Sequence, residues 1–337
     1  MPIGIKMTQQ MLDRFGRIHT NLRISVTDVC NFRCIYCMPE DMTFMPDAAL
    51  MTFDEIVHLT RIFVGLGVNK VRITGGEPLV RPGVPTLIER LAQLERLKDI
   101  SLTTNGIGLI NQAQALYDAG LRRINVSLDT LNEEKFEQMT RRKVLSRVLK
   151  GLKTAHECGF NPIKVNAVAM RGFTDDEIVD LATFARQNDY QLRFIEFMPL
   201  DADDVWGRNM YIPGKEIIEK INAVYPLTQV ILNGEAKSDT AKRYRFSDNG
   251  NEVGVIPSVS DPFCENCNRV RLTADGKFRT CLFSLTETDL LTPLREGASD
   301  ETISELILDA VAQKEAGHKI NAADFIKPER NMSRIGG

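Results

Sequence analysis

The stretch Leu22-Arg-Ile-Ser-Val-Thr27 and the cysteine run Cys30-Asn-Phe-Arg-Cys34-Ile-Tyr-Cys37 decide the fold of this chain. The first six residues alternate between apolar and polar side chains, which is typical of a β-strand. Three cysteines then follow within eight residues. Three thiolates at this spacing can hold an iron–sulfur cluster, which normally takes four ligands. The missing fourth ligand leaves one iron open, and α/β folds place catalytic groups in the loops that follow their strands.

A zinc site is the alternative interpretation of these three cysteines. Structural zinc sites are closed by four ligands, and no fourth cysteine or histidine lies nearby. His19 comes before the strand, and His58 comes well after the loop. The CxxxCxxC spacing is also unusual for zinc, whose cysteines usually come as CxxC pairs. The sequence therefore favours an iron–sulfur cluster over zinc at Cys30, Cys34 and Cys37.

Composition limits the class of protein. The chain has 337 residues, 43% of them hydrophobic, so it can bury a sizeable core in one large domain or a domain plus an extension. No apolar run is long enough for a transmembrane helix, and the N-terminus lacks a signal-peptide core. We expect a cytoplasmic location, where seven cysteines serve as thiolates rather than disulfides. A net charge of −3 argues against broad nucleic-acid binding, although not against a local basic pocket.

Strand-like and helix-like segments alternate through the first two thirds of the chain. The motifs Thr52-Phe-Asp-Glu55 and Thr174-Asp-Asp-Glu177 predict capping boxes that open two of the helices. About six βα units in a row predict a parallel sheet, either an incomplete barrel or a doubly wound sheet. After about residue 200 the pattern loosens. The strand-like segments are 22–27, 70–74, 100–105, 123–129, 163–169 and 192–198.

One face of these expected strands is polar. Helices must cover the apolar face, so the polar face must line the barrel interior, which is normally packed with aliphatic side chains. Burying polar groups without partners costs roughly 1–3 kcal/mol each, so we expect large polar ligands inside. An antiparallel sheet with one wet face is the alternative, and the helical segments disfavour it. The polar positions are Arg23, Ser25, Thr27, Lys70, Arg72, Thr74, Ser101, Thr103, Asn105, Asn125, Ser127, Asp129, Lys164 and Asn166.

The motif Gly75-Gly76-Glu77-Pro78 follows the second strand-like segment. Two glycines allow close approach of the backbone to a ligand, and the proline stiffens the exit from the loop. Together with the three-cysteine loop, this motif resembles the radical S-adenosylmethionine superfamily. The resemblance implies that the open iron chelates the amino and carboxylate groups of the cofactor's methionine moiety, and that the glycine motif lines the amino end.

The same resemblance implies the other contacts of S-adenosylmethionine. Tyr36 corresponds to the residue that contacts adenine, and Met198 corresponds to a backbone contact to adenine. Ser127 and Asn166 correspond to positions on the ribose and carboxylate side. The full set of implied cofactor-binding residues is Tyr36, Gly76, Glu77, Ser127, Asn166, Arg193 and Met198.

A second three-cysteine set, Cys264-x2-Cys267-x13-Cys281, lies near the C-terminus. Zinc is again the alternative, because a CxxC pair with a distant third cysteine is a fair zinc pattern. The fourth ligand is missing here too, since His318 lies 37 residues on, in a stretch that we expect to be helical and charged. We therefore predict a second cluster with an open iron. For Cys158, at an expected helix end, we predict plain packing.

Two arginines follow Cys267 directly, in Cys267-Asn-Arg-Val-Arg271, and their alternation places both side chains on one face. Guanidinium groups suit phosphate oxygens because their donors form a planar fork. With the inward cations of the expected barrel they make six in one cavity of a net-acidic chain, which predicts a polyphosphate ligand. The six are Arg23, Lys70, Arg72, Lys164, Arg269 and Arg271.

Nearly the whole chain is similar to the molybdenum cofactor biosynthesis protein A family, the GTP 3′,8-cyclases. The matching stretches run from Asp13-Arg-Phe-Gly-Arg17 to Ile335-Gly-Gly337. Between them lie both cysteine sets, Leu121-Arg-Arg-Ile-Asn-Val-Ser-Leu-Asp129 and Arg193-Phe-Ile-Glu-Phe-Met198. The first cysteine loop identifies only the superfamily. The downstream cysteines, the paired arginines and the terminal Gly-Gly distinguish this family within it.

The resemblance implies an α/β fold with two parts. Residues 1–235 would form an incomplete (β/α)6 barrel of the radical S-adenosylmethionine type, with the cofactor and the first 4Fe–4S cluster. Residues 236–337 would form a C-terminal extension that closes one mouth and carries the second 4Fe–4S cluster, the GTP site and a Gly-Gly tail that reaches the active site. The contacts of 236–246 stay open, because the stretch before Thr240 does not align.

The implied activity is that of a lyase in molybdenum cofactor biosynthesis. A 5′-deoxyadenosyl radical would take the 3′ hydrogen of GTP, and the ribose would join C8 of guanine to give 3′,8-cyclo-7,8-dihydro-GTP. The second cluster would bind guanine. The resemblance assigns catalytic roles to Arg23, Arg269 and Arg271. It assigns GTP binding to Arg23, Lys70, Arg72, Thr103, Lys164, Arg269 and Arg271.

The implied partners are an electron donor of the flavodoxin or ferredoxin type and cyclic pyranopterin monophosphate synthase, which would take the product. A homodimer is compatible with the resemblance, whereas nucleic acid and membrane partners are not expected. Two other functions stay open at this point. A radical enzyme acting on a peptide would carry more downstream cysteines and would not need six inward cations. An electron-transfer or zinc module would have closed four-cysteine sets, which the sequence lacks.

Overall fold

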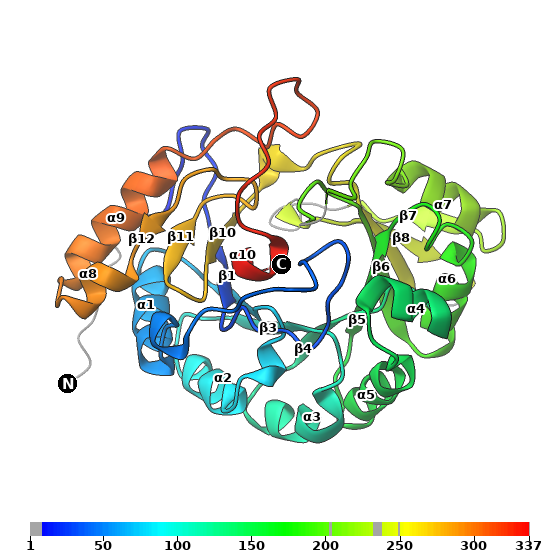
Figure 1. The fold of residues 1–337 in the computed structure, drawn as a ribbon, viewed down its shortest axis with the longest axis horizontal. Helices are drawn as coiled ribbons and strands as arrows, with labels where there is room; N and C mark the ends of the chain where they lie inside the picture. The colour runs from blue at the N-terminus through cyan, green and yellow to red at the C-terminus, as the bar shows by residue number, and fades with distance from the viewer. Residues whose placement is uncertain (1–8, 202–203, 232–237, 249, 337) are drawn as a thin grey trace.

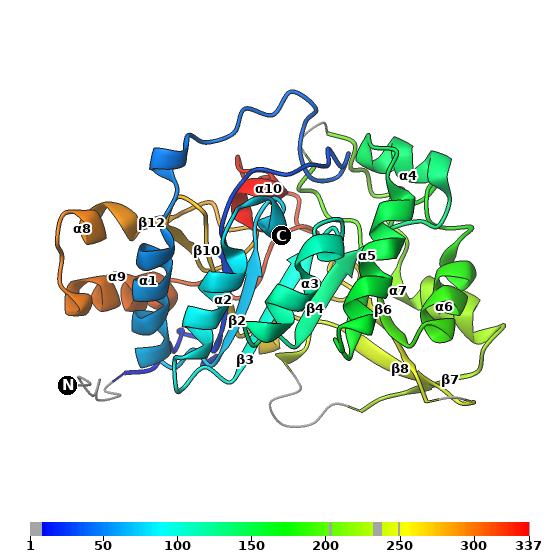
Figure 2. The same cartoon turned by 90° about the horizontal axis from the view of Figure 1, so that it is seen from below.

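The computed structural model describes residues 9–201, 204–231, 238–248 and 250–336. Six parallel strands follow one another in sheet order, and helices cover their outer side (Figures 1 and 2). This confirms the expected (β/α)6 unit. The strands are β1 (Asn21–Ser25), β2 (Lys70–Thr74), β3 (Asp99–Thr104), β4 (Arg123–Ser127), β5 (Ile163–Ala169) and β6 (Tyr190–Glu196). The helices are α1 (Phe53–Gly65), α2 (Val84–Ala92), α3 (Leu109–Asp118), α4 (Glu133–Thr140), α5 (Leu145–Glu157) and α6 (Ile178–Gln187).

The C-terminal third extends this sheet at both edges. Strand β9 (Glu252–Ile256) pairs parallel with β6, and β10 (Arg269–Leu272) pairs parallel with β1. Antiparallel strands then continue the order to β12-β11-β10-β1-β2-β3-β4-β5-β6-β9-β8-β7. The extension therefore adds strands at both edges of the curved sheet, whereas the sequence analysis predicts only that it closes one mouth of the barrel. The added elements are α7 (Gly214–Asn222), β7 (Leu227–Gln229), β8 (Lys242–Phe246), β11 (Lys277–Arg279), β12 (Thr288–Asp289), α8 (Leu291–Arg295), α9 (Asp300–Ala312) and α10 (Met332–Ile335).

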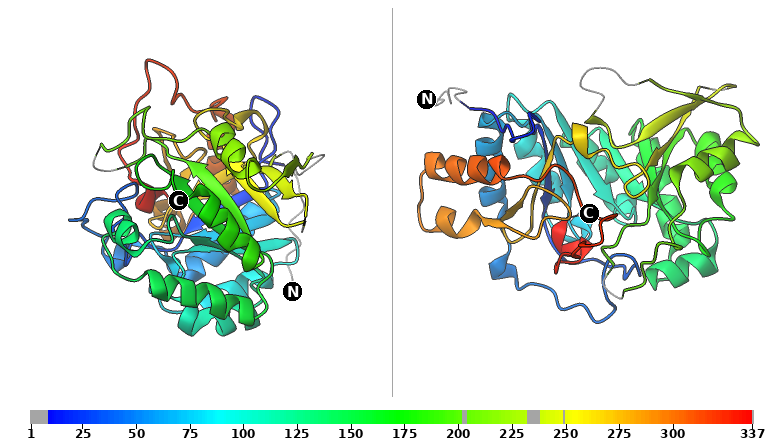
Figure 3. Two further views of the ribbon diagram at one scale, coloured as in Figure 1. Left: turned by 90° about the vertical axis from the view of Figure 1, so that its right-hand side faces the viewer. Right: turned by 90° about the horizontal axis from the view of Figure 1, so that it is seen from above.

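The apolar core lies between the strands and the helices. Leu22, Ile24 and Ile73 are fully buried on the outward face of β1 and β2, while the polar residues between them point into the barrel. Figure 3 shows the helices on the outside of the curved sheet and the C-terminal α10 within its curve. The interior is thus free of the aliphatic layers that fill an ordinary barrel, as the strand alternation predicts.

One of the two predicted capping boxes is present. Thr52 accepts a hydrogen bond from the Glu55 N–H, and the Glu55 carboxylate accepts one from the Thr52 N–H. The prediction at 174–177 is wrong: α6 begins at Ile178 without a side-chain cap. The Thr174 hydroxyl instead accepts from the Met170 N–H, and the Glu177 carboxylate accepts from Thr130 and Leu131. Tertiary hydrogen bonds here replace the local ones that the motif favours.

Two predictions fall on residues outside the described ranges, namely the boundary at 235/236 and the last glycine, Gly337. The described part of the expected extension includes β8, which pairs with β7 from the other side of that boundary. Among the described residues, no helix combines the length and the apolar character needed to cross a membrane.

Helix α5 packs tightly against the loop after β3, and this contact yields a stability prediction. A Cβ atom added at Gly151 would lie 2.0 Å from the Gly106 carbonyl oxygen. Gly151→Ala should therefore destabilise the chain by about 1–3 kcal/mol through overpacking. Thermal unfolding monitored by circular dichroism would measure this. Lys153→Ala on the exposed side of the same helix is the matched control, and equal melting temperatures for the two variants would contradict the close contact.

Candidate active site

The first cysteine set occupies the loop that follows β1, at the C-terminal ends of the parallel strands. All three cysteines are free and partly buried. The loop is held from outside by α4, because the Arg33 and Ile35 N–H groups donate to the carbonyls of Thr140 and Met139. Within the loop, the Cys37 N–H donates to the Cys34 carbonyl at 2.9 Å. These backbone hydrogen bonds thus fix the loop that carries the three free thiols.

The environment of these thiols suits metal-bound thiolates. Burial and the nearby Glu77 raise the pKa of Cys30 to about 12. Burial and the neighbouring cysteines also raise the pKa values of Cys34 and Cys37. Three clustered thiols that resist deprotonation on their own need a bound cation to become thiolates together, which is what iron supplies. The donor set therefore fits an iron–sulfur cluster.

The Gly75-Gly76-Glu77 motif packs directly beneath this loop. A Cβ at Gly76 would lie 2.5 Å from the carbonyl oxygens of Asp28 and Val29, and one at Gly75 would lie 2.7 Å from that of Thr27. The two glycines thus allow backbone to approach backbone, whereas the sequence alone suggests an approach to a ligand. Any side chain at either position would push the cysteine loop away from the sheet.

Glu77 ties two strand ends together below the cysteines. Its carboxylate accepts hydrogen bonds from the Thr104 hydroxyl at 2.7 Å and from the N–H groups of Asn105 at 2.6 Å and Leu79 at 3.0 Å. Burial raises its pKa to about 7, and these hydrogen bonds partly offset that effect. Asn105 in turn donates to the Asn31 side chain inside the loop. Glu77 therefore positions the loop through its neighbours.

Tyr36 faces the opposite side of the barrel mouth. Its hydroxyl donates to the Asp129 carboxylate at 2.7 Å, and that carboxylate also accepts from the Val168 N–H at 2.7 Å. Burial raises the pKa of Asp129 to about 6. Asp129 was not among the predicted site residues. The sequence does indicate it, because Asp129 is the next polar position in the alternation of β4, two residues beyond Ser127.

Three of the residues expected near S-adenosylmethionine form one row across neighbouring strands. Ser127 on β4, Asn166 on β5 and Arg193 on β6 are register partners. The Arg193 guanidinium donates to the side-chain oxygens of Asn166 and Asn125. The row lies inside the barrel, between the cysteine loop above and the N-terminal strand ends below.

Met198 lies two residues beyond the end of β6. Its side chain packs against a small apolar cluster apart from the main core, which includes Leu200 and Phe283. Cys281 of the second cysteine set packs against the same cluster. The position therefore lies close to the second cysteine set.

The second cysteine set is assembled by a hairpin. Cys267 lies just before β10 and Cys281 just after β11, and these two strands pair antiparallel. Cys264 joins them through a short turn, because the Cys267 N–H donates to the Cys264 carbonyl at 3.1 Å. Burial opposes ionisation of Cys267, but the adjacent Arg269 and Lys314 cations lower its pKa to about 6.

His318 lies beside this set, which the sequence does not indicate. It follows the end of α9 in a loop, where the sequence predicts a helical stretch, and its ring packs against Phe283 at a centroid distance of 5.1 Å. In the described residues, no three histidine, cysteine or acidic side chains are arranged to hold a single metal ion.

The inward cations form a second region, at the N-terminal ends of the strands. Arg271, Arg23 and Arg72 are register partners on β10, β1 and β2, so three arginines lie side by side. Next to them lies a cavity of about 170 Å³. Arg23 and Arg72 line this cavity, but Arg271 does not. The cations that line it are Arg23, Lys70, Arg72, Arg123, Lys164, Arg193 and Arg269, and the carboxylates are Asp99 and Asp239.

Five of the six predicted cations therefore converge on this cavity, and Arg123 and Arg193 join them. Arg123 starts β4 in phase with Asn125, so the same alternation extends to it. Thr103 lies partly buried near the end of β3 and does not line the cavity. A second cavity of about 840 Å³ shares Lys70, Ser238 and Asn268 with the first and opens beyond the strand starts.

The electrostatics of the cavity indicate an anionic ligand. Burial and the neighbouring arginines lower the pKa of Arg23 well below its usual range. The same causes lower the pKa of Arg72 to about 10 and that of Arg193 to about 9. Seven cations facing two carboxylates repel one another at low dielectric. A polyanion in the cavity would remove this repulsion, and guanidinium groups suit phosphate oxygens.

Arg271 contacts the C-terminal tail instead of the cavity. Its guanidinium donates to the Gly336 carbonyl. Gly336 has a φ of +83° and lies against β1 and β2, since a Cβ there would be 3.0 Å from the Ser25 Cβ and 3.2 Å from the Thr74 methyl carbon. The described end of the tail therefore reaches the inside of the barrel mouth, close to the cysteine loop.

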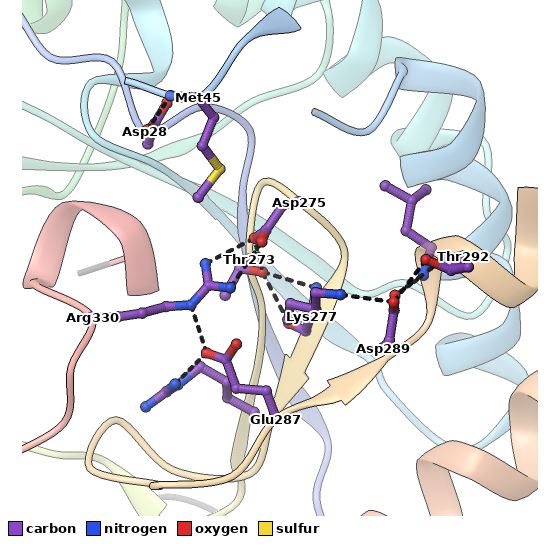
Figure 4. Close-up of polar contacts among 11 residues, drawn as sticks. Asp28, Met45, Thr273, Asp275, Lys277, Glu287, Asp289, Thr292 and Arg330 are labelled. Atoms are coloured by element: carbon purple, nitrogen blue, oxygen red, sulfur yellow. Dashed lines mark hydrogen bonds and ion pairs between the residues drawn. The ribbon is translucent and has the colours of Figure 1, made fainter. Parts of the chain in front are cut away.

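An ion-pair network anchors this tail to the β10–β11 hairpin (Figure 4). Arg330 forms two hydrogen bonds with the Asp275 carboxylate, at 3.0 and 2.8 Å, and an ion pair with Glu287 at 2.8 Å. Glu287 also pairs with the buried Arg279 on β11. A two-pronged arginine–carboxylate contact restricts geometry as well as adding energy. The tail and the hairpin that carries the second cysteine set are thus one connected unit.

Comparison with known proteins places this site in a family context. Residues 24–185 match the Radical SAM superfamily, and residues 190–320 match the family Molybdenum Cofactor Synthesis C. A GTP 3′,8-cyclase of Streptomyces coelicolor is 48% identical over 329 residues, which cover 97% of this chain and 96% of that protein. The mitochondrial GTP 3′,8-cyclase of Arabidopsis thaliana is 44% identical over 98% of this chain and 84% of that protein.

Solved structures show the same fold at low sequence identity. Streptococcus suis SuiB bound to S-adenosylmethionine is similar with a TM-score of 0.62 at 14% identity. The match covers 82% of this chain and 64% of that chain. The likeness supports the barrel architecture alone.

Lys164 provides a pH test of the anion site. Burial and the nearby Arg193 and Arg123 lower its pKa to about 7, so it is largely neutral above that pH. A bound polyanion favours the charged form, so binding takes up a proton and weakens as pH rises above about 7. The limit is about tenfold per pH unit for one proton. Calorimetric titration with tripolyphosphate between pH 6.5 and 9 would measure this slope.

Lys164→Met is the matched variant, because it keeps the side-chain length and removes the titrating group. The ionisation of tripolyphosphate itself affects both proteins equally, so the difference between their slopes isolates Lys164. Parallel slopes in the two proteins would contradict this assignment.

Proposed function

Because the chain belongs to the GTP 3′,8-cyclase family of radical S-adenosylmethionine enzymes, we propose that it converts GTP to 3′,8-cyclo-7,8-dihydro-GTP in molybdenum cofactor biosynthesis. The observation that carries the proposal is the pairing of two free three-cysteine sets with a cation-lined cavity inside one barrel. The cofactors are two 4Fe–4S clusters and S-adenosylmethionine. When bound, they supply the carbon-centred radical that takes a hydrogen atom from the ribose of GTP.

The residues around the first cysteine set bind and orient S-adenosylmethionine in this proposal. Cys30, Cys34 and Cys37 hold the first cluster. Glu77 keeps the loop in place through Asn105, and Tyr36 closes one side of the mouth through its hydrogen bond to Asp129. The other cofactor-binding residues remain Gly76, Ser127, Asn166, Arg193 and Met198. Arg193 also lines the cation cavity, so it would lie between S-adenosylmethionine and GTP.

GTP spans the distance from the cation cavity to the second cysteine set. Cys264, Cys267 and Cys281 hold the second cluster, whose open iron binds the guanine base. Arg269 borders the cavity and lies 3.5 Å from the Cys267 sulfur, so one side chain connects both ends of this site. The residues proposed to bind GTP are Arg23, Lys70, Arg72, Thr103, Lys164, Arg269 and Arg271, and those proposed to be catalytic are Arg23, Arg269 and Arg271.

The protein's contribution to the reaction is positional. A barrel that holds the two substrates at its two ends brings the reacting carbon atoms together, which is worth several kcal/mol of the barrier when the geometry is close to reactive. It must also exclude water and other hydrogen donors from the radical. Arg330 anchors the tail, and the described end of the tail contacts Arg271. At this place the tail would close the end of the barrel at which S-adenosylmethionine binds.

Several wider features belong to the same proposal. We divide the chain by function into 1–235, which binds S-adenosylmethionine, and 236–337, which supplies the second cysteine set and the tail. The enzyme works in the cytoplasm and receives electrons from a flavodoxin- or ferredoxin-type donor. Its product passes to cyclic pyranopterin monophosphate synthase. The proposal is compatible with a homodimer, and it includes neither nucleic acid nor a membrane as a partner.

An anaerobic assay tests the activity itself. Reconstituted protein given GTP, S-adenosylmethionine and a strong reductant should form 5′-deoxyadenosine and the cyclised nucleotide in equal amounts, detected by mass spectrometry. Cys30→Ala should abolish both products, because the first cluster is lost. Cys158→Ala is the matched control, since this cysteine caps α5 away from both sets. Stoichiometric zinc at the second set in protein kept free of oxygen would contradict the two-cluster proposal.

Single arginine variants test where the triphosphate binds. Arg72→Ala should weaken GTP binding about tenfold or more, because a charge-assisted hydrogen bond contributes roughly 1.5–3 kcal/mol. Guanosine binding should change much less, since it has no phosphates. Arg90→Ala on the outer surface of α2 is the control and should leave both affinities unchanged. Equal losses for GTP and guanosine in Arg72→Ala would place the effect in the fold rather than in phosphate binding.

A further inference from the structure

Lys314 is a buried lysine that connects the two arms of the second cysteine set. It follows α9 and is only 4% exposed. Its ammonium donates to the Arg269 carbonyl at 2.8 Å and to the Thr280 carbonyl at 2.7 Å, and it lies 3.9 Å from the Cys267 sulfur. An ammonium has three donors, and these three acceptors use all of them. The contacts hold the chain two residues after Cys267 and one residue before Cys281.

The charge of Lys314 lacks the usual partner. A buried ammonium normally pairs with a carboxylate, because an isolated buried charge is costly. Among the described residues, Lys314 forms no ion pair with an aspartate or glutamate, and its acceptors are two carbonyls and one sulfur. The anions available to balance it are therefore the cysteine thiolates of the second set. Such a charge beside a cluster is one of the factors that set its reduction potential.

Cys264, the remaining cysteine of the second set, is held by the residues that follow Lys314. Arg17 donates to the Cys264 carbonyl at 2.7 Å and to the carbonyls of Ala316 and Glu315, both at 2.6 Å. A Cβ at Gly317 would lie 3.0 Å from the Cys264 Cβ, so the chain passes directly against this cysteine. The turn 314–317 thus contacts the loops of all three cysteines, and Lys314 is its only buried charge among the described residues.

We propose that Lys314 is a positioning residue for the second cluster: its ammonium fixes Cys267 and Cys281 relative to each other and places a positive charge beside the bound cluster. The positive charge stabilises the more negative, reduced state of the cluster, so it makes the cluster easier to reduce. Through the Arg269 carbonyl, the same contact fixes a side chain that lines the cation cavity. This inference rests on the proposed function, because it requires that the second set holds an iron–sulfur cluster.

The test compares Lys314→Met with the unmodified full-length chain after anaerobic reconstitution. Iron and sulfide are counted per chain, and the second cluster is titrated potentiometrically by electron paramagnetic resonance. For the titration, Cys30, Cys34 and Cys37 are changed to Ala so that only the second cluster contributes. We expect Lys314→Met either to lose the iron of the second cluster alone or to keep it at a more negative potential. Lys314→Arg, which retains the charge, should stay closer to the unmodified chain in both measurements.

Lys319→Met is the matched control, because this exposed lysine five residues on pairs with Asp324 and should leave iron content and potential unchanged. Full iron and an unchanged potential in Lys314→Met would overturn the inference. Loss of iron from both clusters together with a lower melting temperature would also overturn it, since Lys314 would then support the fold in general. Absence of a second cluster from the unmodified chain would overturn the proposed function as well, which separates the two failures.

Discussion

Positive charges buried side by side inside the barrel are the constraint on which the rest of this structure depends. Parallel register brings Arg271, Arg23 and Arg72 next to one another, and burial removes the water that would screen them. Two carboxylates in the cavity are too few to balance seven cations. Their mutual repulsion at low dielectric is unfavourable for the folded state. The outer helices and the apolar core must provide the folding energy that permits it, and a polyanionic ligand relieves it.

The incomplete barrel separates two kinds of chemistry by strand direction. Because β1 to β6 are parallel, all their starts lie at one end and all their ends at the other. The cations gather near the starts, where Lys70 and Arg123 are the first residues of their strands. The first cysteine set follows the end of β1. In the proposed function, an anionic ligand and a thiolate-bound metal cluster would therefore approach one interior from opposite ends.

Sequence patterns predicted the parts of this arrangement that depend on local periodicity. The six strands, the polar interior and the two cysteine sets all follow from alternation or from short spacings. Patterns did not predict the contacts made between distant segments. The pairing of β10 with β1 joins residues about 250 positions apart, and no local signal indicates it. His318 reaches the second cysteine set for the same reason, because α9 ends next to the β10–β11 hairpin rather than continuing.

Two short motifs show how tertiary contacts use residues whose local patterns are clear. At 174–177 the capping motif is present, but its side chains form better-buried hydrogen bonds with Met170, Thr130 and Leu131. At Gly75 and Gly76 the lack of a side chain serves a contact with the chain's own backbone. In both places tertiary packing decides the use of a residue whose local meaning was clear.

The tail and the second cysteine set are coupled through ion pairs, and this connects the C-terminus to the inside of the barrel. Arg330 joins Asp275 and Glu287, Glu287 joins Arg279, and Arg279 lies two residues before Cys281. Arg271, on the strand paired with that of Arg279, then holds the Gly336 carbonyl. A shift of the β10–β11 hairpin would therefore move both the second cysteine set and the end of the tail. In the proposed function, binding at the second set and closure of the barrel by the tail would therefore be coupled through this one hairpin.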